Sequence, residues 1–264
     1  MDRTRSIGQE RDGAVATVLL NRPEAGNALT ADLLERLLRT LDMLEKDESV
    51  RVVVLAAAGA DFCIGIDPSA RRPDRRSPAQ DFGRILSDAL APVILRLRDM
   101  RRPVIAAAQG RATGAGLGLL AAADIVLAER GALFALDGVE SGLAPEGAAS
   151  WFLPRLIGLS RARALAMTGA AFGAEEAREF GLVWRVVEEG ASRPAAAALA
   201  QHLAGRAPET LALMKRMFEA TTVASLEEQL QVEANVQRRL GRTEDHREAV
   251  AALAEGRTPV FRGK

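Results

Sequence analysis

The chain has 264 residues, 48% of them hydrophobic, and its 35 basic residues balance its 35 acidic ones. This length allows one large domain or two small ones, and the balanced charge gives no support to nucleic acid or an anionic membrane as a partner. The single cysteine, Cys63, excludes a disulfide framework and a Cys-based metal site. The two histidines, His202 and His246, are expected on helix surfaces rather than in a catalytic triad or a metal site.

Membrane and targeting segments are not expected. Charged residues interrupt the hydrophobic runs before they reach the length of a membrane span. Residues 1–13 lack the apolar core of a signal peptide. We therefore expect a soluble protein of the cytoplasm.

The first half of the chain alternates predicted strands and helices. Continuous apolar runs rich in β-branched residues predict buried strands. We expect them at 14–20, 50–57 and 104–108, with a shorter strand at 61–66. Leucines at helical spacing from Leu33 to Leu44 predict a helix with Thr30 as its N-cap. Residues 80–98 are expected to form another helix, and the basic, proline-containing segment 71–78 a solvated loop.

The second half loses its strands near Gly190. Short strands are expected at 125–128, 132–136 and 183–187, and helices at 160–168 and 174–180. The remainder is predicted to be helical, at 195–205, 209–220, 226–240 and 244–254. We therefore predict an α/β core of repeated ββα units over 1–192, followed by a helical region over 193–264.

A glycine-rich turn at 114–116 lies between the strand 104–108 and a helix predicted from Leu117. Small residues let a ligand approach the backbone, and the first N–H groups of a helix have no partner inside it. The turn can therefore stabilise an oxygen that is becoming negative. The letters GAGLG also resemble half of a dinucleotide fingerprint, but that motif belongs after the first strand, so a nicotinamide enzyme is disfavoured.

Four segments then show a family resemblance. They are NRPEAGNAL at 21–29, FCIGID at 62–67, QGRATGAG at 109–116 and RTPVF at 257–261. With these motifs in this order, the chain resembles the crotonase superfamily, the enoyl-CoA hydratase/isomerase family. The resemblance implies a spiral of ββα units and a C-terminal helical region that builds homotrimers or hexamers. It also implies an acyl-CoA thioester as substrate, with coenzyme A entering as part of it and no metal or redox cofactor.

The same resemblance implies roles for particular residues. The backbone N–H groups of Ile66 and Ala115 correspond to the family's oxyanion hole, in which two donors hold the thioester carbonyl oxygen. Substrate-binding residues follow by position: Arg22, Pro23, Glu24, Ala25, Ala28, Ile64, Gly65, Asp67 and Gly114. Ile66 and Ala115 replace smaller residues of the family pattern, so their bulk is expected to narrow the pocket or shift the donors. Cys63 is expected to be buried packing, and Asp67 to shape the turn that presents Ile66.

The acids decide which reaction is expected. The family's hydratases use two glutamates, and at those positions this chain has Gly118 and Gly138. The segment Pro145-Glu146-Gly147 instead resembles that of the family's single-acid isomerases, which makes Glu146 the expected base. The other interpretation is that Glu146 only begins the helix near Ala148, where acids are favoured. Two nearby acids, Asp137 and Glu140, are held in reserve, and Glu140 is expected to face elsewhere.

The leading hypothesis is double-bond isomerisation of an enoyl-CoA with one glutamate base. The base takes a proton from the carbon next to the thioester and returns it two carbons further on, so no water needs activating. Three alternatives stay open: another reaction of the family such as hydration, thioester hydrolysis or decarboxylation; an acyl-CoA-binding protein without catalysis; and a purely structural oligomer.

Overall fold

A computed structural model describes residues 6–67 and 82–264, and it contains a six-stranded and a three-stranded sheet. The large sheet has the order β1-β2-β3-β4-β6-β9, and the small sheet the order β5-β7-β8. The strands are β1 (Ile7–Asp12), β2 (Val15–Leu20), β3 (Val52–Ala57), β4 (Val104–Ala108), β5 (Arg111–Thr113), β6 (Ile125–Glu129), β7 (Leu133–Ala135), β8 (Phe172–Gly173) and β9 (Arg185–Val187). In the large sheet only β1 is antiparallel to its neighbour, so the parallel strands end at one shared edge.

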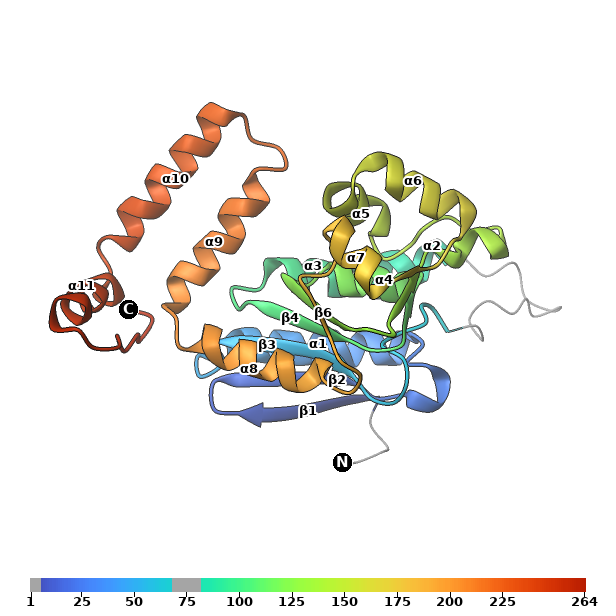
Figure 1. The fold of residues 1–264 in the computed structure, drawn as a ribbon, viewed down its shortest axis with the longest axis horizontal. Helices are drawn as coiled ribbons and strands as arrows, with labels where there is room; N and C mark the ends of the chain where they lie inside the picture. The colour runs from blue at the N-terminus through green and yellow to red at the C-terminus, as the bar shows by residue number, and fades with distance from the viewer. Residues whose placement is uncertain (1–5, 68–81) are drawn as a thin grey trace.

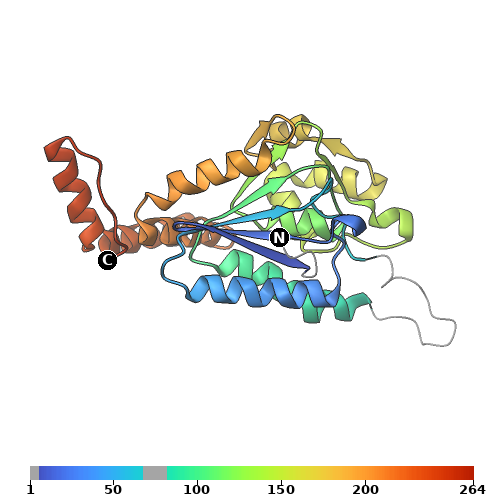
Figure 2. The same ribbon diagram turned by 90° about the horizontal axis from the view of Figure 1, so that it is seen from below.

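Helices cover both faces of the large sheet. The α-helices in the described part of the chain are α1 (Ala31–Lys46), α2 (Phe82–Ile85), α3 (Ala91–Asp99), α4 (Ala115–Ala121), α5 (Ala149–Ile157), α6 (Leu159–Thr168), α7 (Ala174–Phe180), α8 (Ser192–Ala204), α9 (Pro208–Ala220), α10 (Leu226–Leu240) and α11 (Glu244–Glu255). Seen from below, the sheet lies between α1 and α3 on one side and α8 on the other (Figure 2).

Alternate residues of the parallel strands face opposite helical layers. Val18 and Leu55 belong to the core cluster that contains the buried leucines of α1. Leu19 and Val54 belong to a second cluster, in which they pack with Ala196 of α8. Burial on both faces explains why β2 and β3 are continuous apolar runs in the sequence rather than alternating ones.

The expected repeat of strand, strand and helix is present. In one unit β4 joins the large sheet, β5 turns into the small sheet, and α4 follows. In the next, β6 and β7 divide between the sheets in the same way, and α5 and α6 follow after the short 3-10 helix η4 (Asp137–Ser141). The parallel pairing of β5 with β7 places equivalent ends of successive units side by side.

Several elements differ from their predictions. The edge strand β1 was not expected, because its outward residues are polar and only Ile7 is buried. The segment 61–66 forms only isolated bridges, Leu29 with Ile66 and Cys63 with Ala112, since Gly65 at a φ of 93° interrupts the ladder. Helix α4 begins two residues before the predicted start at Leu117.

The predicted helix 80–98 is present in its described part, and the segment 71–78 lies outside the described residues. Residues 82–99 run through α2, a π-helical turn η3 (Leu86–Leu90) and α3. Thr30 caps α1 as predicted, since its side chain accepts the N–H of Leu33 at 3.2 Å. The two histidines lie on exposed helix positions, as expected.

The C-terminal helices α9, α10 and α11 extend away from the sheet, whereas α8 still lies against it (Figure 1). The middle of α9 is held by Lys215, whose ammonium donates to the carboxylate of Asp124 at 2.9 Å and to the carbonyl of Leu97 at 2.8 Å. The same Asp124 accepts the N–H of Val104 at the start of β4. The division at residue 192 stays a prediction. No helix in the described ranges is both long and apolar enough to cross a membrane.

Candidate active site

The candidate site lies where β5 and β7 end. These strands run parallel, with Thr113 opposite Ala135, so the residues that follow each strand emerge at the same edge. The N–H of Gly114 donates to the carbonyl of Ala135 at 3.0 Å and extends this pairing by one residue. Gly114 has a φ of 50°, which favours glycine, and α4 begins at the next residue.

A second backbone segment runs alongside this turn. The N–H of Thr113 donates to the carbonyl of Cys63 at 3.0 Å, and the hydroxyl of Thr113 donates to the carbonyl of Ile64 at 3.2 Å. A methyl group placed on Gly65 would lie 3.4 Å from the backbone nitrogen of Ala115. The turn before Ile66 and the start of α4 are therefore in contact.

Two backbone N–H groups remain available at this contact. Within the described part of the chain, neither the N–H of Ile66 nor that of Ala115 donates a hydrogen bond. Ala115 is the first residue of α4, so its N–H has no partner inside the helix. The bridge between Leu29 and Ile66 uses the carbonyl of Gly65 and the N–H of Asp67, which hydrogen-bond to Leu29. It does not use the N–H of Ile66. The geometry therefore presents two donors from adjoining segments.

The side chains of Ile66 and Ala115 point into the protein. Ile66 is 3% exposed, Ala115 is fully buried, and both belong to the main hydrophobic core cluster. The extra bulk at these two positions thus packs in the core, and its effect on the pocket and the donors stays a prediction. A backbone donor keeps its role whatever side chain it carries.

The segment 21–29 packs against the same turn. Arg22 donates to the Asp67 carboxylate at 2.9 Å and to the carbonyl of Ala28 at 2.6 Å. The N–H of Ile64 donates to the carbonyl of Gly26, directly after the 3-10 helix η1 (Pro23–Ala25), which carries Glu24 on its exposed side. The Arg22–Asp67 pair fits the expected role of Asp67 in shaping the turn. The residues predicted to bind acyl-CoA lie together, while their roles stay predictions.

Asn27 holds this arrangement and was missed as a key residue by sequence reasoning. It is fully buried with a φ of 54°, and its amide donates to the carbonyls of Ala58 and Asp61, both at 2.8 Å. Its side-chain oxygen accepts the N–H of Arg22 at 2.8 Å. The signal available in the sequence was a polar residue placed directly between a turn and the apolar pair Ala28 and Leu29.

Glu146 reaches the turn at Gly114. A methyl group placed on Gly114 would lie 3.3 Å from Oε1 of Glu146 and equally 3.3 Å from Oδ1 of Asp137. The next residue, Gly147, packs on Ala115, because a methyl group on Gly147 would lie 3.0 Å from the Ala115 carbonyl oxygen. Glu146 therefore stands beside the donor of Ala115, and it precedes the first turn of α5 rather than forming part of it.

Of the two glycines at the hydratase positions, Gly118 has no room for a side chain and Gly138 has little. A methyl group on Gly118 would meet the carbonyl oxygen of Gly147 at 2.1 Å. One on Gly138 would lie 3.1 Å from the carbonyl oxygen of Leu143 and 3.2 Å from that of Ala144. The segment that carries Glu146 thus occupies the space that a glutamate at 118 would need.

The thiol of Cys63 is buried beneath the site. Burial raises the pKa of Cys63 to about 12, and the negative charge of Glu146 adds to that rise. The thiol therefore stays protonated near neutral pH and is not a nucleophile. Its expected packing role is confirmed by its place in the core cluster.

The aromatic residues after Glu146 divide between core and surface. Phe152 is 4% exposed and belongs to the core, as does Ala149. Trp151 is 37% exposed, and the guanidinium of Arg155 lies 4.1 Å from its ring centre. Of these three side chains, Ala149 and Phe152 therefore belong to the core and Trp151 lies at the surface.

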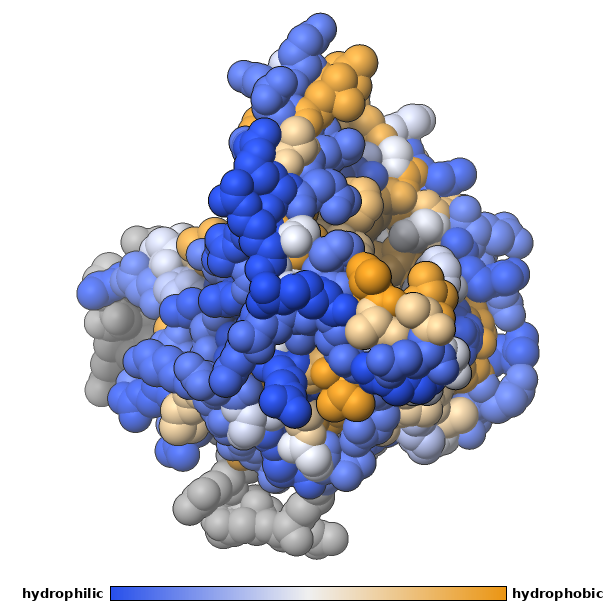
Figure 3. All heavy atoms as spheres, turned by 90° about the vertical axis from the view of Figure 1, so that its left-hand side faces the viewer, coloured by the Kyte–Doolittle hydropathy of each residue, from blue (hydrophilic) through white to orange (hydrophobic). Residues whose placement is uncertain are grey.

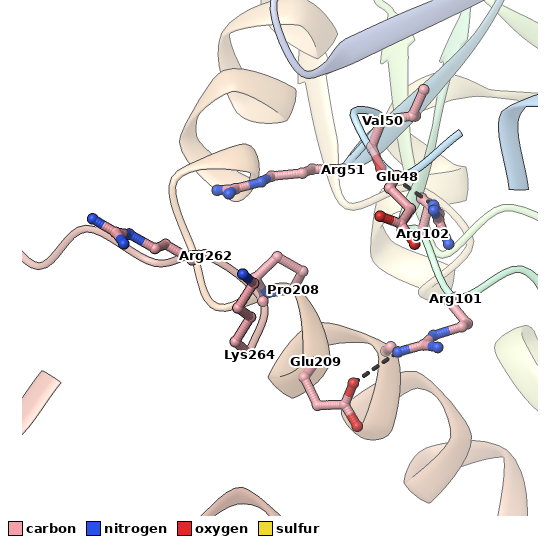
Figure 4. Close-up of a pocket in the computed structure, with 11 residues that line it drawn as sticks. Glu48, Val50, Arg51, Arg101, Arg102, Pro208, Glu209, Arg262 and Lys264 are labelled. Carbon is pink, nitrogen blue, oxygen red and sulfur yellow. Dashed lines mark hydrogen bonds and ion pairs between the residues drawn. The ribbon is translucent and has the colours of Figure 1, made fainter. Parts of the chain in front are cut away.

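A pocket at the opposite edge of the sheet is lined by several arginines, whose contacts hold parts of the fold together (Figure 4). Arg101 pairs with Glu209 at the start of α9, at 2.7 Å. Arg51 donates to the carbonyls of Ala204 and Phe261, and so ties the C-terminal segment to the start of β3. These cations hold the C-terminal helices to the sheet.

Comparison with known proteins agrees with this geometry. A family model described as enoyl-CoA hydratase/isomerase matches residues 10–264. The chain is 38% identical over 250 residues to the 1,2-epoxyphenylacetyl-CoA isomerase of Escherichia coli, covering 95% of each chain. It is 32% identical over 254 residues to the trans-2-decenoyl-[acyl-carrier-protein] isomerase of Streptococcus mutans, covering 96% of each. An enoyl-CoA hydratase structure from Mycobacterium smegmatis matches with a TM-score of 0.90 and 32% identity, covering 97% of this chain and 99% of the other.

The repeat of strand, strand and helix, with a backbone turn open beside a carboxylate, is the architecture of a crotonase-type protein. Because the match extends over nearly its whole length, the chain belongs to the enoyl-CoA hydratase/isomerase family. The resemblance drawn from the four sequence motifs is confirmed.

Proposed function

We propose that this protein is an enoyl-CoA isomerase that moves a double bond along an acyl-CoA thioester, with Glu146 as its base. The observation that carries the proposal is the position of the Glu146 carboxylate at Gly114, next to the unused N–H of Ala115. Two similar proteins, from Escherichia coli and Streptococcus mutans, are named as isomerases, and these names support isomerisation as the reaction.

The proposed reaction begins when Glu146 removes a proton from the carbon next to the thioester of a 3-enoyl-CoA. The electrons move onto the carbonyl oxygen, which accepts hydrogen bonds from the N–H groups of Ile66 and Ala115. Fixed donors of this kind are each worth about 3 kcal/mol to a developing oxyanion. Protonation two carbons further on then gives the 2-enoyl-CoA.

The glycines at 118 and 138 favour isomerisation over hydration. Hydration in this family relies on two glutamates at those positions to hold and split a water, and the packing of Gly118 on Gly147 leaves no room for one of them. Isomerisation needs no added water. The acyl group is proposed to be apolar, and the named hydratase relative keeps hydration as the alternative to be measured.

The first experiment compares wild type with Glu146→Gln on a medium-chain 3-enoyl-CoA. We expect wild type to exchange the α-proton and to form the 2-enoyl-CoA, and the variant to lose about 10²–10⁴-fold of that rate, since it lacks the general base. Formation of the conjugated product is followed by absorbance, and exchange by mass spectrometry in deuterated water.

Glu140→Gln is the matched control. Glu140 is exposed, and its side chain lies 3.7 Å from the position of a methyl group on Gly169, away from the turn at Gly114. We expect this variant to keep wild-type activity. Full turnover by Glu146→Gln would refute the proposed base, and a product heavier by one water would identify hydration instead.

A further inference from the structure

Asp137 is a second acid at the same turn. It follows β7 by two residues, whereas Gly114 follows β5 by one, and the parallel pairing of these strands brings the two positions together. Its Oδ1 and the Oε1 of Glu146 each lie 3.3 Å from the position that a methyl group on Gly114 would take. The two oxygens are therefore at most twice that distance apart, on the same side of the turn.

Within the described part of the chain, the Asp137 carboxylate has no structural partner. It is half-buried, and in residues 6–67 and 82–264 it forms no hydrogen bond and no ion pair. It does not cap the 3-10 helix η4, which begins at this residue. Other acids near this edge have such tasks, since Asp67 pairs with Arg22 and Asp61 pairs with Arg111. A half-buried carboxylate is normally satisfied by the protein, so its orientation toward Gly114 calls for a role in the site.

We infer that Asp137 is a second catalytic residue, which delivers the proton that completes the isomerisation begun by Glu146. This inference rests on the proposed function. The sequence hypothesis uses Glu146 alone to remove and return the proton, whereas the scheme inferred here uses two acids. These acids lie at positions 137 and 146, not at positions 118 and 138 where the family's hydratases have their two glutamates.

The proton balance of this relay closes without any further reactant. Glu146 takes a proton from C2, and the C2–H electron pair delocalises over the C2–C3–C4 unit onto the thioester oxygen. Asp137 takes a proton from solvent and gives it to C4, while the electrons return from oxygen to form the C2–C3 double bond. Glu146 is left protonated and Asp137 ionised, and Glu146 then releases its proton to solvent, so that one proton leaves and one enters in each turnover.

The test separates proton removal from proton delivery. In the variant Asp137→Asn, Glu146 and both backbone donors remain, so we expect α-proton exchange to continue at a rate close to that of wild type. Formation of the 2-enoyl-CoA should fall by about 10²-fold, as for loss of a general acid. Asp137→Ala is measured in parallel, and Glu140→Gln again serves as the matched control.

An isotope label adds an independent readout. A 3-enoyl-CoA carrying deuterium at C2 is converted in ordinary water, and the product is examined for deuterium at C4. In the relay, wild type places little of the C2 label at C4, because that proton comes from Asp137. In Asp137→Asn, the residual turnover should carry more label to C4, since Glu146 then serves both carbons.

The remaining outcomes contradict either the role of Asp137 or the proposed function itself. Unchanged isomerisation in both Asp137 variants, or an equal fall in exchange and isomerisation, would overturn the role of Asp137 and leave Glu146 as the proposed single acid. Absence of both exchange and isomerisation in wild type would instead overturn the proposed function, and the relay with it.

Discussion

Residues 146–149 show how backbone conformation serves the site. Glu146 reaches Gly114, and Gly147 and Ala148 follow with φ values of 65° and 59° before α5 begins. Two consecutive left-handed residues turn the chain sharply into α5. A glycine adopts this conformation without cost, whereas an alanine is strained by about 1–2 kcal/mol.

Ala148→Gly is therefore expected to stabilise the protein. The relief of strain exceeds the greater entropy of glycine in the unfolded chain, which leaves a gain of about 0.5–1 kcal/mol in the free energy of unfolding. Urea denaturation measures it. Ala149→Gly is the matched control, and it should destabilise by about 1 kcal/mol because Ala149 is the first residue of α5 in ordinary helical conformation. A loss at both positions would contradict this account.

At the scale of elements, polar contacts attach the C-terminal helices to the core. Burial lowers the pKa of Lys215 in α9, and the Asp124 carboxylate opposes that effect by stabilising the ammonium. Arg98 of α3 and Glu219 of α9 form a second ion pair between core and helix. The position of α9 thus depends on groups that are costly to leave without a partner.

Lys215→Met tests this attachment. It removes the donor to both Asp124 and the Leu97 carbonyl, and we expect a loss of about 2–4 kcal/mol in the free energy of unfolding, with faster hydrogen exchange in α9. Lys46→Met, at an exposed position of α1, is the control and should change stability by less than about 0.5 kcal/mol. A similar small effect from Lys215→Met would show that packing alone holds α9.

The C-terminal motif predicts an acid-dependent contact. Arg257 and the N–H of Val260 both donate to Glu248 and lower its pKa from 4.5 to about 2. Because the folded-state value is depressed, the contact stabilises the fold above about pH 4.5 and is lost as the pH falls toward 2. We expect Glu248→Gln to reduce the pH dependence of unfolding within this window. Glu244→Gln, at an exposed position of α11, should leave it unchanged.

At the scale of the whole molecule, hydrophobic side chains remain exposed on the C-terminal helices. The larger ones include Phe218, Leu226 and Leu253, which are 66%, 72% and 84% exposed, and Val223 in the turn between α9 and α10 is 90% exposed. Hydrophobic patches interrupt the otherwise hydrophilic surface on this side of the molecule (Figure 3). Exposed apolar surface of this kind marks sites of protein association.

We therefore expect self-association through these helices. Light scattering should give a mass three or six times the 28.1 kDa of the chain. Leu226→Glu places a charge on the α9–α10 pair and should lower the mass, whereas Leu95→Glu, at a position on α3 that is 65% exposed, should not. A monomer in wild type would contradict the predicted trimer or hexamer.

Local rules determined much of this protein from sequence alone. The helix 226–240 has its predicted bounds and Thr30 its predicted cap, because helical periodicity and capping act over a few residues. Family motifs predicted the roles of Glu146 and the two backbone donors, and these roles stay predictions. The tertiary structure alone decided that 61–66 forms bridges rather than a strand, that Gly147 fills the space at Gly118, and that Asp137 meets Glu146 at Gly114. These contacts depend on parallel strands pairing across long stretches of chain, and no short-range pattern encodes that register.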